Sequence, residues 1–168
     1  MKTTIITLGM GAIAAAALAG DPIPNALINY DKFQRIVTES ANERQSRRLT
    51  EDSFLARMKE PDVIVLDARS ESKYRLRHIK GAINLPYTEF TESILAHLVP
   101  EKGSRILIYC NNNFLGSPNA FASKTPAASL NLSTYTSLKA YGYTNVFELG
   151  PLLNISNTKI PFEGTEVK

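Results

Sequence analysis

The sequence predicts an α/β fold in which a parallel β-sheet is flanked by helices on both faces. Two runs of largely apolar residues, within 63–66 and 105–109, lack the alternation of a half-exposed strand. Continuous runs of this kind are typical of strands that are buried on both faces, as in a parallel sheet. Segments with helical spacing of apolar residues lie between the strands, and this alternation favours parallel pairing. The length of 168 residues suits one domain.

The remaining strands are weaker in the sequence. Apolar and polar residues alternate over 33–37, which predicts a first strand, and a polar loop is expected to follow it through Arg48. A short strand is expected over 82–86 and a last one over 146–149. Together with the two buried runs, these segments supply the strands of the predicted sheet.

Helices are expected between the strands. Thr50 offers a cap, and acidic residues follow it, for a helix that reaches Lys59. Further helices are expected over 72–76, 88–98 and 129–141. The long segment 111–127 has no regular pattern, and the tail after Gly150 has only a weak one.

The first residues differ in composition from the rest of the chain. Lys2 supplies a positive start, an apolar stretch rich in Ala and Gly follows over 5–18, and small residues surround Ala19. This pattern predicts a secretory signal peptide over 1–19 and a protein exported to the periplasm or secreted. An uncleaved N-terminal anchor is the alternative.

After cleavage, residues 20–168 would form a single domain with its core at about 33–150 and a C-terminal tail. Loss of Lys2 would lower the formal net charge from +3 to +2. This mild charge, without a Lys/Arg block and interleaved aromatic residues, argues against a nucleic-acid partner. No membrane partner is expected once the leader is removed. The densest basic residues are expected on a solvated face: Arg44, Arg47, Arg48 and Arg57.

The chain has a single cysteine, Cys110, which follows the second buried run directly. A lone thiol in an exported protein is either buried packing or present for chemistry. In parallel α/β sheets, ligands bind at the carboxyl ends of strands, where helix N-termini provide positive potential. A thiolate is the reactive form of cysteine, and such potential stabilises it. The position of Cys110 therefore suits a nucleophile.

Four ordered segments resemble the rhodanese-like (sulfurtransferase) domain family: 63–69, 78–86, 106–110 and 138–150. The resemblance covers about residues 33–150 and implies a rhodanese-like parallel sheet. It also implies that Cys110 is a persulfide-forming nucleophile. Such an enzyme moves a sulfane sulfur from a donor such as thiosulfate to a thiol or cyanide acceptor. No cofactor is implied, and two distant His and one Cys give no recognisable metal-binding spacing.

The loop after Cys110 departs from the family pattern. Typical single-domain members have a short loop, often with an Arg, that leads straight into the next helix. Here a run of three Asn and a Phe follows, and the next helix is not expected before 129. We predict that the Asn side chains line the sulfur pocket and that Phe114 and Phe121 cover it; a polar surface turn is the alternative. The residues predicted to contact substrate are Asn111, Asn112, Asn113, Phe114, Lys124 and Arg69.

Two further residues are predicted to be structural neighbours of the site. Asp67 and Arg69 match a family pair, and bonding to neighbouring loops is favoured for this pair over substrate contact. His78 is expected to bond backbone near the Gly81 turn rather than to act in catalysis.

The sequence bears on two rival functions. A cysteine phosphatase or arsenate reductase needs an Arg six positions after its Cys to clamp the oxyanion. Position 116 is Gly116, and no Arg occurs after Cys110. The other rival is a non-catalytic rhodanese-like module that binds a sulfur compound or a protein partner, which the unusual loop motivates.

Overall fold

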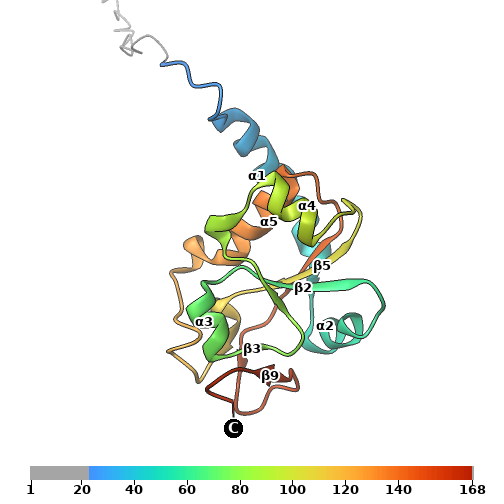
Figure 1. Ribbon diagram of the computed structural model, residues 1–168, viewed down its shortest axis with the longest axis vertical. Coiled ribbons are helices and arrows are strands. Elements are labelled where there is room, and N and C mark those ends of the chain that lie inside the picture. The colour runs from blue at the N-terminus through green and yellow to red at the C-terminus, as the bar shows by residue number, and fades with distance from the viewer. Residues whose placement is uncertain (1–22, 168) are drawn as a thin grey trace, which may run out of the picture.

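A parallel five-stranded sheet forms the centre of the protein in the computed structural model, which describes residues 23–167 (Figure 1). Its strands lie in the order β1-β7-β5-β2-β4, and all pairs are parallel. The strands span Arg48–Leu49 (β1), Val63–Asp67 (β2), Ile83–Asn84 (β4), Arg105–Tyr109 (β5) and Val146–Leu149 (β7). The two apolar runs are the adjacent central strands β2 and β5, so the predicted buried parallel pair is confirmed.

Helices cover both faces of this sheet, as predicted. Helix α2 (Glu51–Met58) lies on one face, and α4 (Glu92–Leu98) and α5 (Leu130–Ala140) lie on the other (Figure 1). Helix α3 (Glu71–Leu76) follows β2. Thr50 caps α2 as expected, since its side chain accepts a hydrogen bond from the Ser53 amide. The helix expected over 88–98 begins later, at Glu92, because Thr91 caps it there and a 3-10 turn precedes it.

The predicted first strand over 33–37 is wrong, and so is the polar loop after it. Both belong to helix α1 (Tyr30–Arg47), which packs against α5. Asn29 caps this helix by accepting a hydrogen bond from the Lys32 amide. Phe33 and Val37 have the i, i+4 spacing of a helix face as well as strand alternation, and both are exposed. A five-residue window cannot separate the two periods.

The predicted irregular segments contain short elements that pair with each other. Strand β6 (Phe114–Leu115) lies in the loop after Cys110 and pairs in parallel with β8 (Leu153–Asn154) in the tail. Strand β3 (His78–Ile79) pairs with β9 (Phe162–Glu163), also in the tail. Single 3-10 turns span Tyr87–Glu89, Asn111–Asn113 and Pro126–Ala128. The tail is therefore an integral part of the fold and fastens the loop.

The predicted leader over 1–19 lies outside the described residues. Among the helices within 23–167, none combines the length and apolar character that a bilayer-spanning segment requires.

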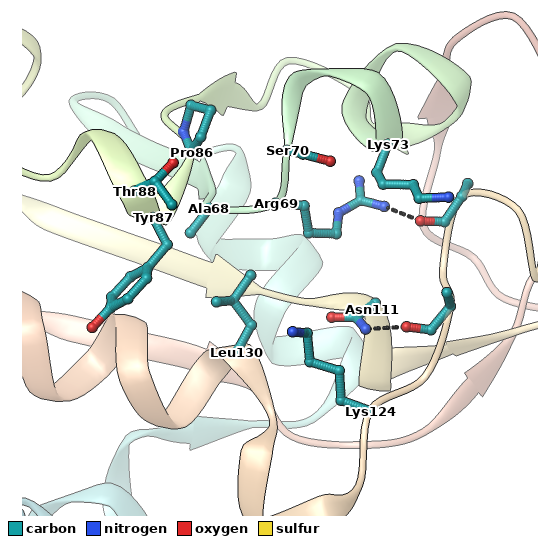
Figure 2. A pocket seen from close by; sticks show the side chains of 12 residues that line it. Ala68, Arg69, Ser70, Lys73, Pro86, Tyr87, Thr88, Asn111, Lys124 and Leu130 are labelled. Carbon is teal, nitrogen blue, oxygen red and sulfur yellow. Dashed lines mark hydrogen bonds between the residues drawn. The ribbon is translucent and has the colours of Figure 1, made fainter.

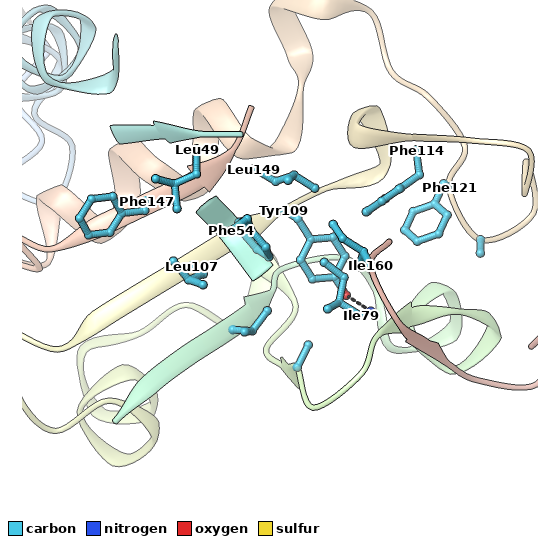
Figure 3. Close-up of a cluster of buried hydrophobic side chains, with 13 residues drawn as sticks. Leu49, Phe54, Ile79, Leu107, Tyr109, Phe114, Phe121, Phe147, Leu149 and Ile160 are labelled. Carbon is cyan, nitrogen blue, oxygen red and sulfur yellow. Dashed lines mark hydrogen bonds between the residues drawn. The ribbon is translucent and has the colours of Figure 1, made fainter. Parts of the chain in front are cut away.

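The core consists of two apolar clusters, one on each face of the sheet. One cluster joins α2 to the loop and the tail, and Figure 3 shows Phe54, Tyr109, Phe114 and Ile160 within it. The other cluster fills the space between the sheet and helices α4 and α5. Residues along β5 alternate between the clusters, with Leu107 in the first and Ile108 in the second, and both are fully buried. Strand β5 therefore packs into both core clusters, and Cys110 follows directly after its last residue.

A buried polar network crosses the end of this strand. The Tyr109 hydroxyl donates to Asp67 Oδ2 at 2.5 Å and accepts from the Ile79 amide at 3.1 Å. Asp67 also pairs with Arg69, whose Nη2 lies 2.5 Å from Oδ2. Burial raises the pKa of Tyr109 well above its usual value, and the neighbouring Asp67 charge raises that pKa further. The tyrosine therefore keeps its proton in the folded state.

This network predicts a decline in stability at alkaline pH that Tyr109→Phe reduces. The pKa of a tyrosine in the unfolded chain is about 10, whereas folded Tyr109 keeps its proton above that pH. The stability that protonated Tyr109 contributes is therefore complete below about pH 10 and is lost as the pH rises, by up to about 1.4 kcal/mol per pH unit. Urea unfolding between about pH 8 and about pH 11 should show that the free energy of unfolding falls less steeply with pH in the variant than in the wild type. The variant should also lose about 1–3 kcal/mol at neutral pH, because Asp67 and Ile79 lose a partner.

The matched control is Tyr30→Phe, on the exposed start of α1. This change should alter neither the stability at neutral pH nor the alkaline decline. Equal declines in wild type and Tyr109→Phe would refute the role of the network.

Candidate active site

Cys110 lies between the end of β5 and a 3-10 turn formed by the next three residues. Its Sγ accepts a hydrogen bond from the Asn112 amide at 3.4 Å. The Ser129 hydroxyl, which precedes α5, lies 3.4 Å from the same sulfur. Two polar groups from opposite ends of the long loop therefore meet at the thiol, and the N-terminal end of α5 is beside it.

The side chain of Asn113 fixes the backbone around this cysteine. Its Oδ1 accepts a hydrogen bond from the Cys110 amide at 2.9 Å and another from Asn131 Nδ2 at 3.2 Å. Its Nδ2 donates to the carbonyl oxygen of Leu149 at 2.8 Å and to that of Pro151 at 3.2 Å. Both ends of one buried amide are thus fully used, and they join β5, α5 and the segment after β7.

A cavity of about 480 Å³ opens at the thiol and is called the Cys110 pocket here. Cys110 is one of the residues that line this cavity, and only 1% of its surface is exposed. Asn131 is 5% exposed, and its Oδ1 has no hydrogen-bond partner within the described residues. The pocket is lined by Arg44, Arg48, Cys110, Asn112, Asn113, Pro126, Ser129, Asn131, Leu132, Glu148, Leu149, Gly150 and Leu152.

The charged side chains of this pocket come from α1, β1 and β7. Arg44 Nη2 lies 2.5 Å from Glu148 Oε1, and Arg48 Nε lies 3.6 Å from the same oxygen. Arg48 is exposed, as the expected solvated face requires, whereas this expectation is wrong for the half-buried Arg44. It is also wrong for Arg47 and Arg57, whose guanidinium groups lie 4.7 Å and 4.2 Å from the ring centroid of Phe147.

A second cavity, of about 390 Å³, holds three of the residues predicted to contact substrate. Figure 2 shows Arg69, Asn111 and Lys124 around it, together with Lys73 from α3. Its lining shares no residue with the Cys110 pocket. The structure therefore divides the predicted substrate residues: Asn112 and Asn113 lie at the thiol, whereas these three lie in the neighbouring cavity.

Two of the Asn side chains tie the long loop to itself. Asn111 Nδ2 donates to the Ala122 carbonyl oxygen. Asn112 Nδ2 donates to the Lys124 carbonyl oxygen at 2.7 Å, and its Oδ1 accepts the Lys124 amide at 3.0 Å. The Lys124 side chain is exposed. These bonds close the segment into a ring, which a short surface turn would not need.

Phe114 and Phe121 do not cover the sulfur pocket. They are 1% and 2% exposed, and their ring centroids lie 4.7 Å apart within the first core cluster. Phe162 from the tail packs against both. Neither residue lines the Cys110 pocket, because strand pairing between the loop and the tail turns this part of the loop into the core.

The pair of Asp67 and Arg69 makes internal bonds. Arg69 Nη1 donates to the Ala120 carbonyl oxygen at 2.9 Å, and Nη2 donates to that of Arg77, also at 2.9 Å. Burial alone would lower the pKa of Arg69, but the hydrogen bond and charge of Asp67 outweigh burial and raise it. The guanidinium therefore stays charged and holds the long loop against α3.

His78 lies outside the Cys110 pocket, on β3. Its Nδ1 is 2.8 Å from the Tyr74 carbonyl oxygen, so its backbone partner is on α3 rather than at the Gly81 turn. The ring stacks on Tyr74 at 3.7 Å between centroids.

Within residues 23–167, no group of three or more His, Cys, Asp or Glu side chains could hold a metal ion.

Sequence reasoning missed the polar and charged residues that elements distant in the chain contribute to the Cys110 pocket: Arg44, Arg48, Ser129, Asn131 and Glu148. Strand register brings some of them together. Arg48 lies opposite Glu148, and Glu148 lies opposite Ile108, two residues before the cysteine. The sequence signal that was available is the i, i+4 spacing of Arg44 and Arg48, but their partner strand could not be read from it.

The rhodanese-like domain family matches residues 50–150. The chain belongs to the rhodanese-like domain family. This match includes Cys110 and Glu148, but it begins after α1 and β1, so Arg44 and Arg48 lie outside it.

Two curated relatives share part of this sequence. Thiosulfate sulfurtransferase PspE from Escherichia coli (strain K12) is 32% identical over 95 residues, which cover 56% of this chain and 76% of PspE. The tRNA uridine(34) hydroxylase from Bacillus velezensis is 36% identical over 67 residues, which cover 38% of this chain and only 21% of the hydroxylase. Proteins with this domain therefore have more than one role.

Solved structures share the fold at lower identity. BH2092 from Bacillus halodurans has a TM-score of 0.53 and 21% identity, over 79% of this chain and 88% of that one. Alr3790 from Anabaena sp. has a TM-score of 0.50 and 24% identity, over 71% and 94%. An EanB complex with hercynine has a TM-score of 0.52 and 22% identity, over 70% of this chain but 27% of EanB. These similarities establish the rhodanese-like α/β fold.

The role of Asn113 leads to a testable prediction. Asn113→Ala removes the partners of the Cys110 amide and of the Leu149 carbonyl, and each buried group left unpaired costs about 1–3 kcal/mol. Urea unfolding should therefore show a markedly lower free energy of unfolding. Asn112→Ala is the matched control, because its bonds reach only the exposed Lys124 backbone, and it should cost about 1 kcal/mol or less. Equal losses in the two variants would contradict the assigned role.

Proposed function

We propose that this protein is a sulfurtransferase that carries a sulfane sulfur as a persulfide on Cys110. The observation that carries the proposal is the position of the only cysteine, in the lining of a cavity at the carboxyl edge of the sheet. The family match and the similarity to a thiosulfate sulfurtransferase support activity of this type. We propose thiosulfate as a donor and a thiol or cyanide as the acceptor.

The proposed reaction has two steps. The Cys110 thiolate attacks the outer sulfur of thiosulfate, and a new S–S bond forms. The S–S bond of thiosulfate breaks, and its electron pair leaves with sulfite, so the enzyme holds Cys–S–S⁻. An acceptor thiolate or cyanide then attacks the terminal sulfur and forms a new persulfide or thiocyanate. The electron pair of the enzyme's S–S bond returns to Cys110 as a thiolate.

The groups around the sulfur suit negative charge. The Asn112 amide donates to Sγ, and the Ser129 hydroxyl is within reach of it. The N-terminal end of α5, an eleven-residue helix, is beside the pocket and contributes positive potential. Fixed donors of this kind stabilise charge without reorganisation during the reaction.

A non-catalytic binding module is the second candidate. The observations that favour it are the low exposure of Cys110 and the lack of any Arg in the loop after it. In that case the cavity would bind a sulfur compound or a protein partner, and the thiol would serve only in packing.

Export is also part of the proposal. The expected signal peptide over 1–19 would place the enzyme in the periplasm or outside the cell. N-terminal sequencing of the protein recovered from its native host should then begin at Gly20, whereas an intact start at Met1 would refute cleavage.

Treatment with thiosulfate tests the enzyme against the module. The intact mass should rise by one sulfur atom, and this increase should disappear after reduction. Cys110→Ser should show no increase, because its oxygen cannot form the persulfide. Incubation of the labelled protein with cyanide should release thiocyanate and restore the starting mass. A wild-type protein that is folded, and whose mass stays unchanged in excess thiosulfate and in excess of a neutral organic trisulfide, would refute the proposal in favour of the module.

A further inference from the structure

The N-terminal segment that precedes the matched family domain contributes charge to the Cys110 pocket. Helix α1 and strand β1 bring Arg44 and Arg48 into its lining. The loop after Cys110 carries no arginine, and its one cationic side chain, Lys124, lies in the other cavity. The pocket at the sulfur would therefore have no cationic side chain without this segment.

The segment is held in place by contacts with the domain. Arg48 of β1 pairs in register with Glu148 of β7. Further along α1, Glu43 accepts a hydrogen bond from Lys139 of α5 at 2.8 Å. The helix is thus fixed to both the sheet and α5, and the arginines at its end have a defined position.

The charges of the pocket leave an excess of one positive charge. Its lining contains two arginines and one carboxylate, and no other charged side chain. Glu148 is 2% exposed and makes its short ion pair with Arg44, at 2.5 Å. Arg48 is farther from this carboxylate, at 3.6 Å, and its side chain is 47% exposed. The negative charge of Glu148 is therefore compensated mainly by Arg44, and Arg48 faces the cavity as the less engaged cation.

Arg48 also retains hydrogen-bond donors. A guanidinium carries five N–H groups in a planar fork. One of them, on Nη2, donates to the Gly150 carbonyl oxygen at 3.0 Å. The remaining donors suit an oxyanion, because the guanidinium fork matches the spacing of its oxygens. The pocket also contains the unpaired acceptor Asn131 Oδ1. This oxygen would repel an anion, but the Asn131 side chain carries no net charge.

We propose that Arg48, with Arg44 and Glu148 as its supporting ion pair, selects an anionic sulfur donor for Cys110. The site would take a small sulfur oxyanion whose negative end contacts Arg48 while its outer sulfur faces the thiol. The inference rests on the proposed function, because it assigns the donor class for the same cysteine. It places the cations of the Cys110 pocket on a segment outside the matched domain.

Alkylation of Cys110 tests the charge without any need for sulfur transfer. Iodoacetate is anionic and iodoacetamide is neutral, and both react with the same thiolate, so their rate ratio reports the local potential. Because the chain has one cysteine, all label reports this site. In Arg48→Gln the ratio of iodoacetate to iodoacetamide rates should fall about three- to tenfold at low salt, since one nearby charge is removed. Arg48→Lys keeps the charge and should restore most of the ratio.

Arg35→Gln is the matched control. It removes the same charge from an exposed position on α1 outside the pocket and should leave the ratio unchanged. Thermal unfolding should confirm that each variant is folded. If Arg48→Gln does not fold, Arg44→Gln provides the second test, with a fall in the ratio expected there too.

Steady-state kinetics supply the second measurement. For thiosulfate, KM should rise about three- to tenfold in Arg48→Gln with a smaller change in kcat, whereas a neutral organic trisulfide should show no such rise. An unchanged alkylation ratio in a folded variant would overturn the proposal, as would a thiol that neither reagent alkylates. If the ratio falls but no persulfide forms with any donor, the charge assignment stands and the sulfurtransferase proposal fails.

Discussion

One side chain, Asn113, sets the geometry on which the candidate site depends. Its amide accepts the Cys110 N–H and donates to the carbonyl oxygen of Leu149, so it joins the ends of two neighbouring parallel strands. Because the group is buried, the bonds are not in exchange with water, and loss of any one leaves a costly unpaired atom. The thiol is therefore held where the Asn112 amide and the Ser129 hydroxyl converge on it.

The segments before and after the matched family domain also shape the site around Cys110. The tail pairs β8 with β6 and thereby draws the long loop into the core, where Phe114 packs. The N-terminal helix leads into β1, which pairs with β7 and places Arg48 in the Cys110 pocket. A long loop without regular pattern is often functional or disordered. Here, ring closure by Asn111 and Asn112 and pairing with the tail order it.

Local signals in the sequence were sufficient for the central strands and for the position of Cys110. The runs that became β2 and β5 are apolar throughout, which admits few other interpretations. The segment 33–37 was predicted wrongly, because so short a window fits both a strand and a helix. Pocket residues such as Arg48 and Glu148 meet only through strand register, which no local pattern encodes. Phe114 and Phe121 were misplaced for a related reason, since pairing with the tail decides which way the loop faces.

A crystal structure of the protein after treatment with thiosulfate tests the central claim most directly. The account predicts one additional sulfur atom bonded to Cys110 Sγ, directed into the cavity between Ser129 and Arg48. Unmodified Sγ in crystals kept in excess thiosulfate, with the cavity closed around the thiol, would contradict it.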